Sequence, residues 1–112
     1  MAGPTTTSEG QTLTDGTEQF LGPFAGSKYY QFSIDLFPLA VAETIKVRWY
    51  KKVHSSGTTR RFQIETYTGD RTIEPLSPVV DSGPFWIANE CNLSIQQTAG
   101  SFHTFNWEVL EP

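Results

Sequence analysis

Alternation of apolar and polar residues with a period of two is the feature that most constrains the fold. In residues 28–35, Tyr30, Phe32 and Ile34 share one parity, and polar residues occupy most of the other. A half-buried β-strand shows this pattern because its successive side chains point to opposite faces. The alternation recurs in residues 44–53, 60–67 and 102–110. No segment repeats apolar residues at helical spacing over three turns, so the sequence predicts an all-β protein.

A hairpin is predicted around Gly57. Residues 44–53 and 60–67 flank a short loop that contains this glycine, which is typical of two antiparallel strands joined by a turn. The apolar residues of both strands, Trp49 and Phe62 among them, are expected to face the core.

The remaining segments predict further strands. Residues 70–84 contain three prolines, so we expect a loop, an edge strand or both. Residues 85–97 are interpreted as one irregular strand, and the turn at 98–101 as the start of a second hairpin. Six to eight short strands at a spacing of roughly ten residues favour a single antiparallel β-sandwich or jelly roll over residues 18–112.

Residues 1–17 are expected to form an extended N-terminal arm. Apart from Met1, Leu13 is the only large apolar residue in this segment, which therefore contributes little to a core. We expect the arm to be held by a neighbouring subunit. The residues that we expect it to use in binding a partner are Thr5, Thr7, Glu9, Gln11 and Leu13.

Charge is distributed in blocks along the 112 residues, whose net charge is −4. Residues 43–71 hold seven basic residues against three acidic ones, and residues 72–112 hold five acidic residues and no basic one. An acidic chain is a poor candidate for binding nucleic acid. The basic hairpin suits a contact with a second copy or a charged scaffold, or else its charges only keep a solvated edge from aggregating. The candidate interface residues are Arg48, Lys51, Lys52, Arg60 and Arg61.

The sequence offers little for catalysis or metal binding. His54 and His103 are the only histidines, Cys91 is the only cysteine, and no Gly-x-Ser-x-Gly motif is present. We therefore expect no enzymatic activity, cofactor, metal or small-molecule substrate, and a small buried thiol at Cys91. Neither a signal peptide nor an apolar run of membrane-spanning length is expected, and the single cysteine suggests production in a reducing cytoplasm.

Four aromatic residues, Tyr29, Tyr50, Tyr67 and Trp86, are less clearly directed inward than the others. Tyr50 and Tyr67 have the opposite parity to the apolar residues of their strands, and Trp86 lies near a proline. Exposed aromatic side chains mark protein interfaces or platforms on which sugars stack, and both interpretations stay open.

Several of these strand segments resemble a family of small proteins encoded in the structural gene clusters of tailed bacteriophages. The matching segments are YQFSIDL at 30–36, IKVRWYKKV at 45–53, GTTR at 57–60, TYTG at 66–69, QTAGS at 97–101 and FNWEVL at 105–110. Ser77-Pro78 in the proline-rich loop also fits this family.

The resemblance implies a virion structural protein, with a head decoration (cement) protein of jelly-roll fold as the leading interpretation. Its partners would be the major capsid protein and further copies of itself, and it would reach the capsid surface from the host cytoplasm during assembly. A cyclic oligomer, with a trimer favoured, would cover exposed strand edges. The alternatives are a carbohydrate-binding module of a tail fibre and a free-standing host protein.

Overall fold

Nine strands account for the period-two segments of the sequence. The computed structural model describes residues 5–112, which contain no helix, so the all-β prediction is confirmed. The strands are β1 (Thr5–Leu13), β2 (Gln19–Phe20), β3 (Lys28–Asp35), β4 (Thr44–Lys52), β5 (Thr59–Thr68), β6 (Val79–Asp81), β7 (Phe85–Ile87), β8 (Cys91–Ala99) and β9 (Thr104–Glu111).

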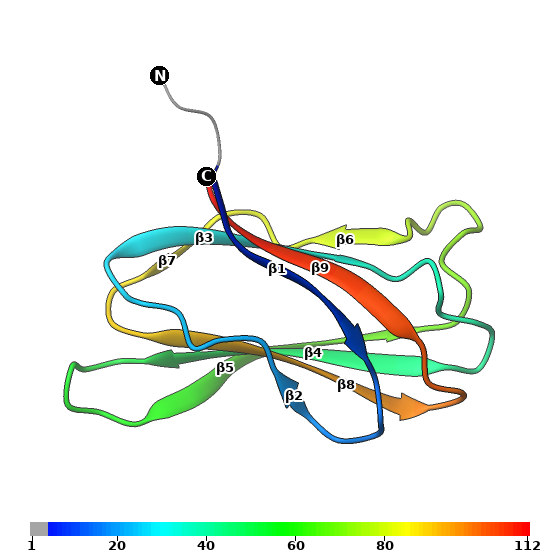
Figure 1. Ribbon diagram of the computed structural model, residues 1–112, viewed down its shortest axis with the longest axis horizontal. Helices are drawn as coiled ribbons and strands as arrows, with labels where there is room; N and C mark the ends of the chain where they lie inside the picture. Colours follow the sequence, from blue (N-terminus) through cyan, green and yellow to red (C-terminus); the bar gives the residue numbers. More distant parts are fainter. Residues whose placement is uncertain (1–4) are drawn as a thin grey trace.

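The strands form two antiparallel sheets that pack face to face (Figure 1). One sheet has the order β1-β9-β3-β6, with β7 also paired to β3, and the other has the order β2-β8-β4-β5. Because β6 and β7 follow one another along β3, they act as one interrupted strand. With that strand counted once, the chain changes sheet at every connection except the β4–β5 hairpin, and the eight strands have the order of a jelly roll. The predicted sandwich is therefore confirmed.

The core lies between the two sheets and uses the predicted parity in most strands. The rings of Phe32 in β3 and Trp49 in β4 meet edge to face, with 6.2 Å between their centroids, and so connect the sheets. Further buried apolar residues from the strands are Tyr30, Ile34, Ile45, Val47, Leu93, Ile95, Phe105 and Val109.

The predicted hairpin is present as β4 and β5, but the expected burial of Phe62 and Ile64 is wrong. These side chains are 40% and 41% exposed. In the register of the hairpin, Ile64 lies opposite Arg48, and so it points to the outer face of the sheet with that residue. Tyr67 lies opposite the buried Ile45 and faces inward. Apolar–polar alternation shows which residues of an edge strand share a face, but it does not determine which of the two faces packs against the core.

Two predicted connections are also wrong. Residues 85–97 are not one strand, because β7 belongs to the first sheet and β8 to the second. The turn at 98–101 does not close a hairpin either, since β8 and β9 lie in different sheets. Apolar periodicity marks the residues that meet the core, and a sandwich presents the same core to strands of both sheets.

The segment expected as an arm is, over residues 5–13, an extended edge strand. β1 pairs with β9 of the same chain from Thr5 to Leu13, with one bulge. Its Gly10 lies against Trp107, where an added Cβ would be 2.8 Å from the indole Cζ2. The Trp107 indole N–H donates to Thr12 Oγ1 at 2.9 Å. The chain itself therefore holds residues 5–13, and residues 1–4 lie outside the described part.

Candidate interaction surfaces

The outer faces of the two sheets carry opposite charge. On the β1-β9-β3-β6 sheet, Glu9 pairs with Glu108, Glu108 with Ser33, and Ser33 with Asp81, so these residues form one row across the sheet. Asp35 follows two residues after Ser33 on the same face. The acidic terminal blocks of the sequence thus meet on one sheet, because β1 and β9 are neighbours there.

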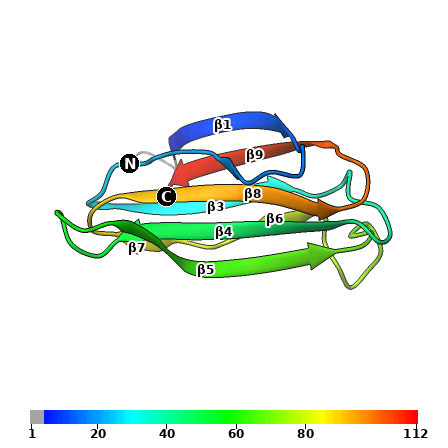
Figure 2. The same cartoon turned by 90° about the horizontal axis from the view of Figure 1, so that it is seen from below.

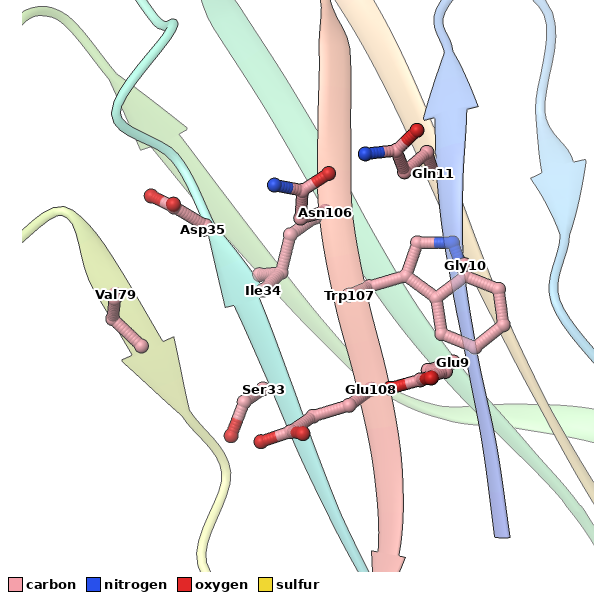
Figure 3. Close-up of a pocket in the computed structure, with 10 residues that line it drawn as sticks. All are labelled: Glu9, Gly10, Gln11, Ser33, Ile34, Asp35, Val79, Asn106, Trp107 and Glu108. Carbon is pink, nitrogen blue, oxygen red and sulfur yellow. The ribbon is translucent and has the colours of Figure 1, made fainter. Parts of the chain in front are cut away.

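A hollow of about 610 Å³ lies on this outer face (Figure 3). We call it the acidic trough and define it by six of its lining residues, which are Glu9, Gln11, Asp35, Val79, Asn106 and Glu108. Two of the predicted arm residues, Glu9 and Gln11, therefore share a site with β9, some 95 residues further along the chain. Of the other arm residues, Thr7 donates its hydroxyl to Glu111 Oε2 at 2.8 Å, Leu13 is exposed, and Thr5 is placed only by its backbone pairing with Glu111.

The carboxylates of this face differ in how they are held. Burial alone would raise the pKa of Asp81, but hydrogen bonds from Ser33 Oγ (2.6 Å), the Gly83 backbone N–H (2.7 Å) and the Gln31 amide lower it overall. In contrast, none of the ion pairs found among residues 5–112 involves Glu9, Asp35 or Glu108. Negative charge on this face is therefore concentrated in the trough.

The outer face of the β2-β8-β4-β5 sheet is basic and partly apolar. Phe20 in β2 lies opposite Ser94, Ser94 lies opposite Arg48, and Arg48 lies opposite Ile64, which makes a row across all four strands. We call this surface the basic face and define it by Phe20, Lys46, Arg48, Tyr50, Arg61 and Ile64.

The Glu18 carboxylate contacts three side chains at the centre of the basic face. Its Oε2 accepts hydrogen bonds from the hydroxyls of Tyr50 and Ser94, the latter at 2.5 Å, and lies 3.7 Å from Arg48 Nη1. Burial would raise the pKa of Glu18, but these hydrogen bonds and the charge of Arg48 lower it. Arg48 also donates to Gln96 Oε1 at 2.9 Å. Sequence reasoning missed Glu18, because a lone acid before a two-residue strand carries no recognisable signal.

The aromatic candidates have different environments. Tyr50 is half-buried, with its ring centroid 5.4 Å from that of Phe20, and Tyr67 packs against the core with the Arg71 guanidinium 4.9 Å above its ring. Neither tyrosine is fully exposed: Tyr50 lies on the outer face beside Phe20, and the register of β5 turns Tyr67 toward the core. Trp86 is 51% exposed and meets the exposed Tyr29 edge to face at 5.0 Å.

The basic residues of the hairpin do not form one cluster. Arg48 and Arg61 belong to the basic face, whereas Lys51, Lys52 and Arg60 lie near the loop. Lys51 Nζ lies 4.9 Å from the Phe62 ring centroid, and Lys52 Nζ lies 3.6 Å from Glu90 Oε2. Arg60 is exposed at the loop end of β5.

The histidines have structural partners. His54 Nδ1 is 2.9 Å from Ser56 Oγ in the hairpin loop, and His103 Nε2 is 2.7 Å from Glu43 Oε1. Over residues 5–112, no three His, Cys, Asp or Glu side chains gather closely enough to hold a metal ion. The same residues include no helix of the length and apolarity needed to cross a lipid bilayer.

Cys91 is buried at the start of β8, and we expect it to be unreactive in the folded protein. Burial, and then the charge of Glu90, raise the pKa of its thiol to about 12. Because the thiolate is the reactive form, iodoacetamide at neutral pH should alkylate Cys91 at least tenfold more slowly in native than in denatured protein. Mass spectrometry of quenched samples measures both rates, and equal rates would contradict the prediction.

Comparison with protein-family models, curated proteins and solved structures finds no match to this chain. The features that bear on function are therefore the two outer faces, the exposed aromatic pair and the resemblance of the strand segments. The fold alone does not choose among functions, because jelly rolls occur in viral capsid proteins and in lectins.

Proposed function

We propose that the protein is a virion structural protein of a tailed phage, a decoration protein that binds the outer surface of the head through its basic face. The observation that carries this proposal is the composition of that face. Phe20 and Ile64 are 53% and 41% exposed there, beside Arg48 and Arg61. If this face served only to keep the protein soluble, we would expect polar residues in place of these exposed apolar side chains.

Aromatic and arginine side chains side by side are typical of the centres of protein interfaces. The network around Glu18 holds Arg48 and Tyr50 in fixed orientations before binding, which lowers the entropy lost when a partner docks. The resemblance to phage structural proteins supplies the class of partner, an acidic capsid surface that repeats many times on one particle. Stabilisation of the seams between capsid subunits would then come from many non-covalent contacts.

Quantitative mass spectrometry of purified particles tests the proposal. Peptides of this protein should be present in hundreds of copies per particle when scaled to the major capsid protein. A few copies would instead indicate a tail component, and a protein missing from washed particles would contradict the virion role.

A single substitution tests the basic face itself. Ile64→Asp places a charge in the centre of this face and should lower particle occupancy at least tenfold, equivalent to about 1.4 kcal/mol of binding free energy. Leu76→Asp is the matched control, because Leu76 is 43% exposed but lies in the loop before β6. Equal occupancy for the two variants would exclude this face as the capsid-binding surface.

The exposed Tyr29–Trp86 pair favours a second candidate, a carbohydrate-binding module of a tail fibre or adsorption apparatus. Two adjacent aromatic rings on an open face provide a surface on which sugars stack. Binding on a glycan array that disappears in Trp86→Ala would support this candidate. If the intact protein binds no glycan on the array, the carbohydrate-binding candidate is excluded and only the capsid proposal remains.

A further inference from the structure

The acidic trough contains an arrangement that costs stability. Glu9 and Glu108 are direct cross-strand partners on β1 and β9, and like charges in such positions repel each other. Neither carboxylate has a cationic partner among residues 5–112, and Asp35 lines the same hollow. Figure 3 shows that these acids surround the hollow together with the side chains of Gln11 and Asn106. A cationic group bound here would relieve the repulsion.

The chain presents a segment of complementary chemistry at the loop of the β4–β5 hairpin. This segment, the hairpin end, is residues 51–60, and it carries Lys51, Lys52 and Arg60 but no acidic residue. Val53, the first residue of the loop after β4, is 84% exposed. The trough in turn offers the 55% exposed side chain of Val79 beside its carboxylates. Each surface thus combines one exposed apolar side chain with charges of one sign.

We infer that the acidic trough of one copy binds the hairpin end of a second copy. The trough and the hairpin end belong to different sheets of the sandwich, with β1 and β5 at opposite edges (Figure 2). One copy therefore uses its trough and the next its hairpin end, which is a heterologous contact that produces a ring or an open chain of copies. This contact uses neither the basic face nor a capsid, and so it stands independently of the function proposed above.

Sedimentation velocity over a range of protein concentrations tests the contact. The intact protein should form oligomers at about 0.01 M salt and dissociate at about 1 M salt, since charge interactions are screened over about 3 Å at the higher concentration. The trough variant Glu9→Gln/Glu108→Gln and the hairpin variant Lys51→Gln/Arg60→Gln should each stay monomeric at low salt.

Mixing the two variants gives the decisive result. The hairpin variant keeps an intact trough and the trough variant keeps an intact hairpin end, so an equimolar mixture should form a dimer and nothing larger. The control Glu74→Gln/Arg71→Gln, which changes one acid outside the trough and one base outside both the hairpin end and the basic face, should associate as the intact protein does. The trough variant should also melt at a higher temperature, which excludes unfolding as the cause of its failure to associate.

A monomeric intact protein at low salt would overturn the inference. Oligomers that persist in either variant would also overturn it, because they would show that another surface joins the copies. Particle occupancy is measured separately, so failure here and failure of the capsid proposal give different results.

Discussion

Replacing Glu43 with alanine is expected to lower the free energy of unfolding by about 2–3 kcal/mol, because it leaves two backbone N–H donors without the charged acceptor that they bind. The Glu43 side chain is among the few buried acidic groups, with only 6% of the residue exposed. Its carboxylate accepts hydrogen bonds from the backbone N–H groups of Ala40 and Ser101, both at 2.8 Å, and lies 2.7 Å from His103 Nε2. It therefore ties the loop before β4 to the connection between β8 and β9.

Urea denaturation of the purified protein measures this loss. Glu65→Ala is the matched control, because Glu65 lies in the exposed edge strand β5 and its removal should change the free energy of unfolding by less than about 0.5 kcal/mol. A loss below about 1 kcal/mol for Glu43→Ala would show that the network contributes little to stability.

The same carboxylate predicts a pH dependence. The Ala40 backbone N–H makes the largest contribution and lowers the pKa of Glu43, burial opposes it, and the bonds to His103 and Ser101 lower the pKa further. The pKa in the folded state is therefore below the ordinary value of 4.5. Because the unfolded chain binds the proton more readily, the stabilisation by Glu43 is complete above pH 4.5 and is lost as the pH falls through the folded-state pKa.

Urea titrations between neutral pH and about pH 3 check the sign of this effect. The intact protein should lose stability as the pH falls below 4.5, and Glu43→Gln should lose less over the same range. The stability of Glu43→Gln should still depend partly on pH, because the pKa values of Glu18 and Asp81 are also lowered. Identical slopes for the two proteins would contradict the assignment.

The sequence predicted the fold class but not the connections, and the physical reason is specific. Period two identifies Tyr30, Phe32 and Ile34 as inward residues from local information alone. Whether β8 pairs with β9 depends instead on which sheet each strand joins, and both sheets present the same apolar core. The burial predicted for the edge strand β5 is wrong for a related reason, because Ile64 shares the outer face with Arg48 and Phe62 is also exposed.

The candidate surfaces were predictable only in part. The blocks of charge were visible in the sequence, as were the basic hairpin and the acidic residues of the N-terminal segment. That Glu9 meets Glu108 follows from the pairing of β1 with β9, which no local pattern encodes. The Glu18 network likewise joins residues 30 to 76 positions apart, and Glu43 and His103 are 60 positions apart.

Replacing Gly100 with alanine is expected to cost about 3 kcal/mol of stability, from two separable causes. Gly100 has a φ of +87°, and this left-handed conformation costs a residue with a Cβ roughly 1–2 kcal/mol. The added Cβ would also lie 2.2 Å from Glu43 Cγ. Because Glu43 is held by its three partners, it cannot move aside without breaking hydrogen bonds.

Gly69 separates the two causes. It has a nearly identical φ of +84°, but no heavy atom lies within 4 Å of the position of its Cβ. Gly69→Ala should therefore cost only the backbone strain, about 1–2 kcal/mol. Urea denaturation of both variants measures the difference, which represents the collision with Glu43.

A double-mutant cycle tests that assignment directly. In a Glu43→Ala background the Cγ at 2.2 Å from the new Cβ is gone and the residue-43 Cβ at 2.9 Å remains, so Gly100→Ala should cost less than in the intact protein and approach the cost of Gly69→Ala. The two substitutions would thus be less than additive. Additive losses would mean that the turn at Gly100 is strained by its own backbone alone, and that the Glu43 network does not constrain the crossing from β8 to β9.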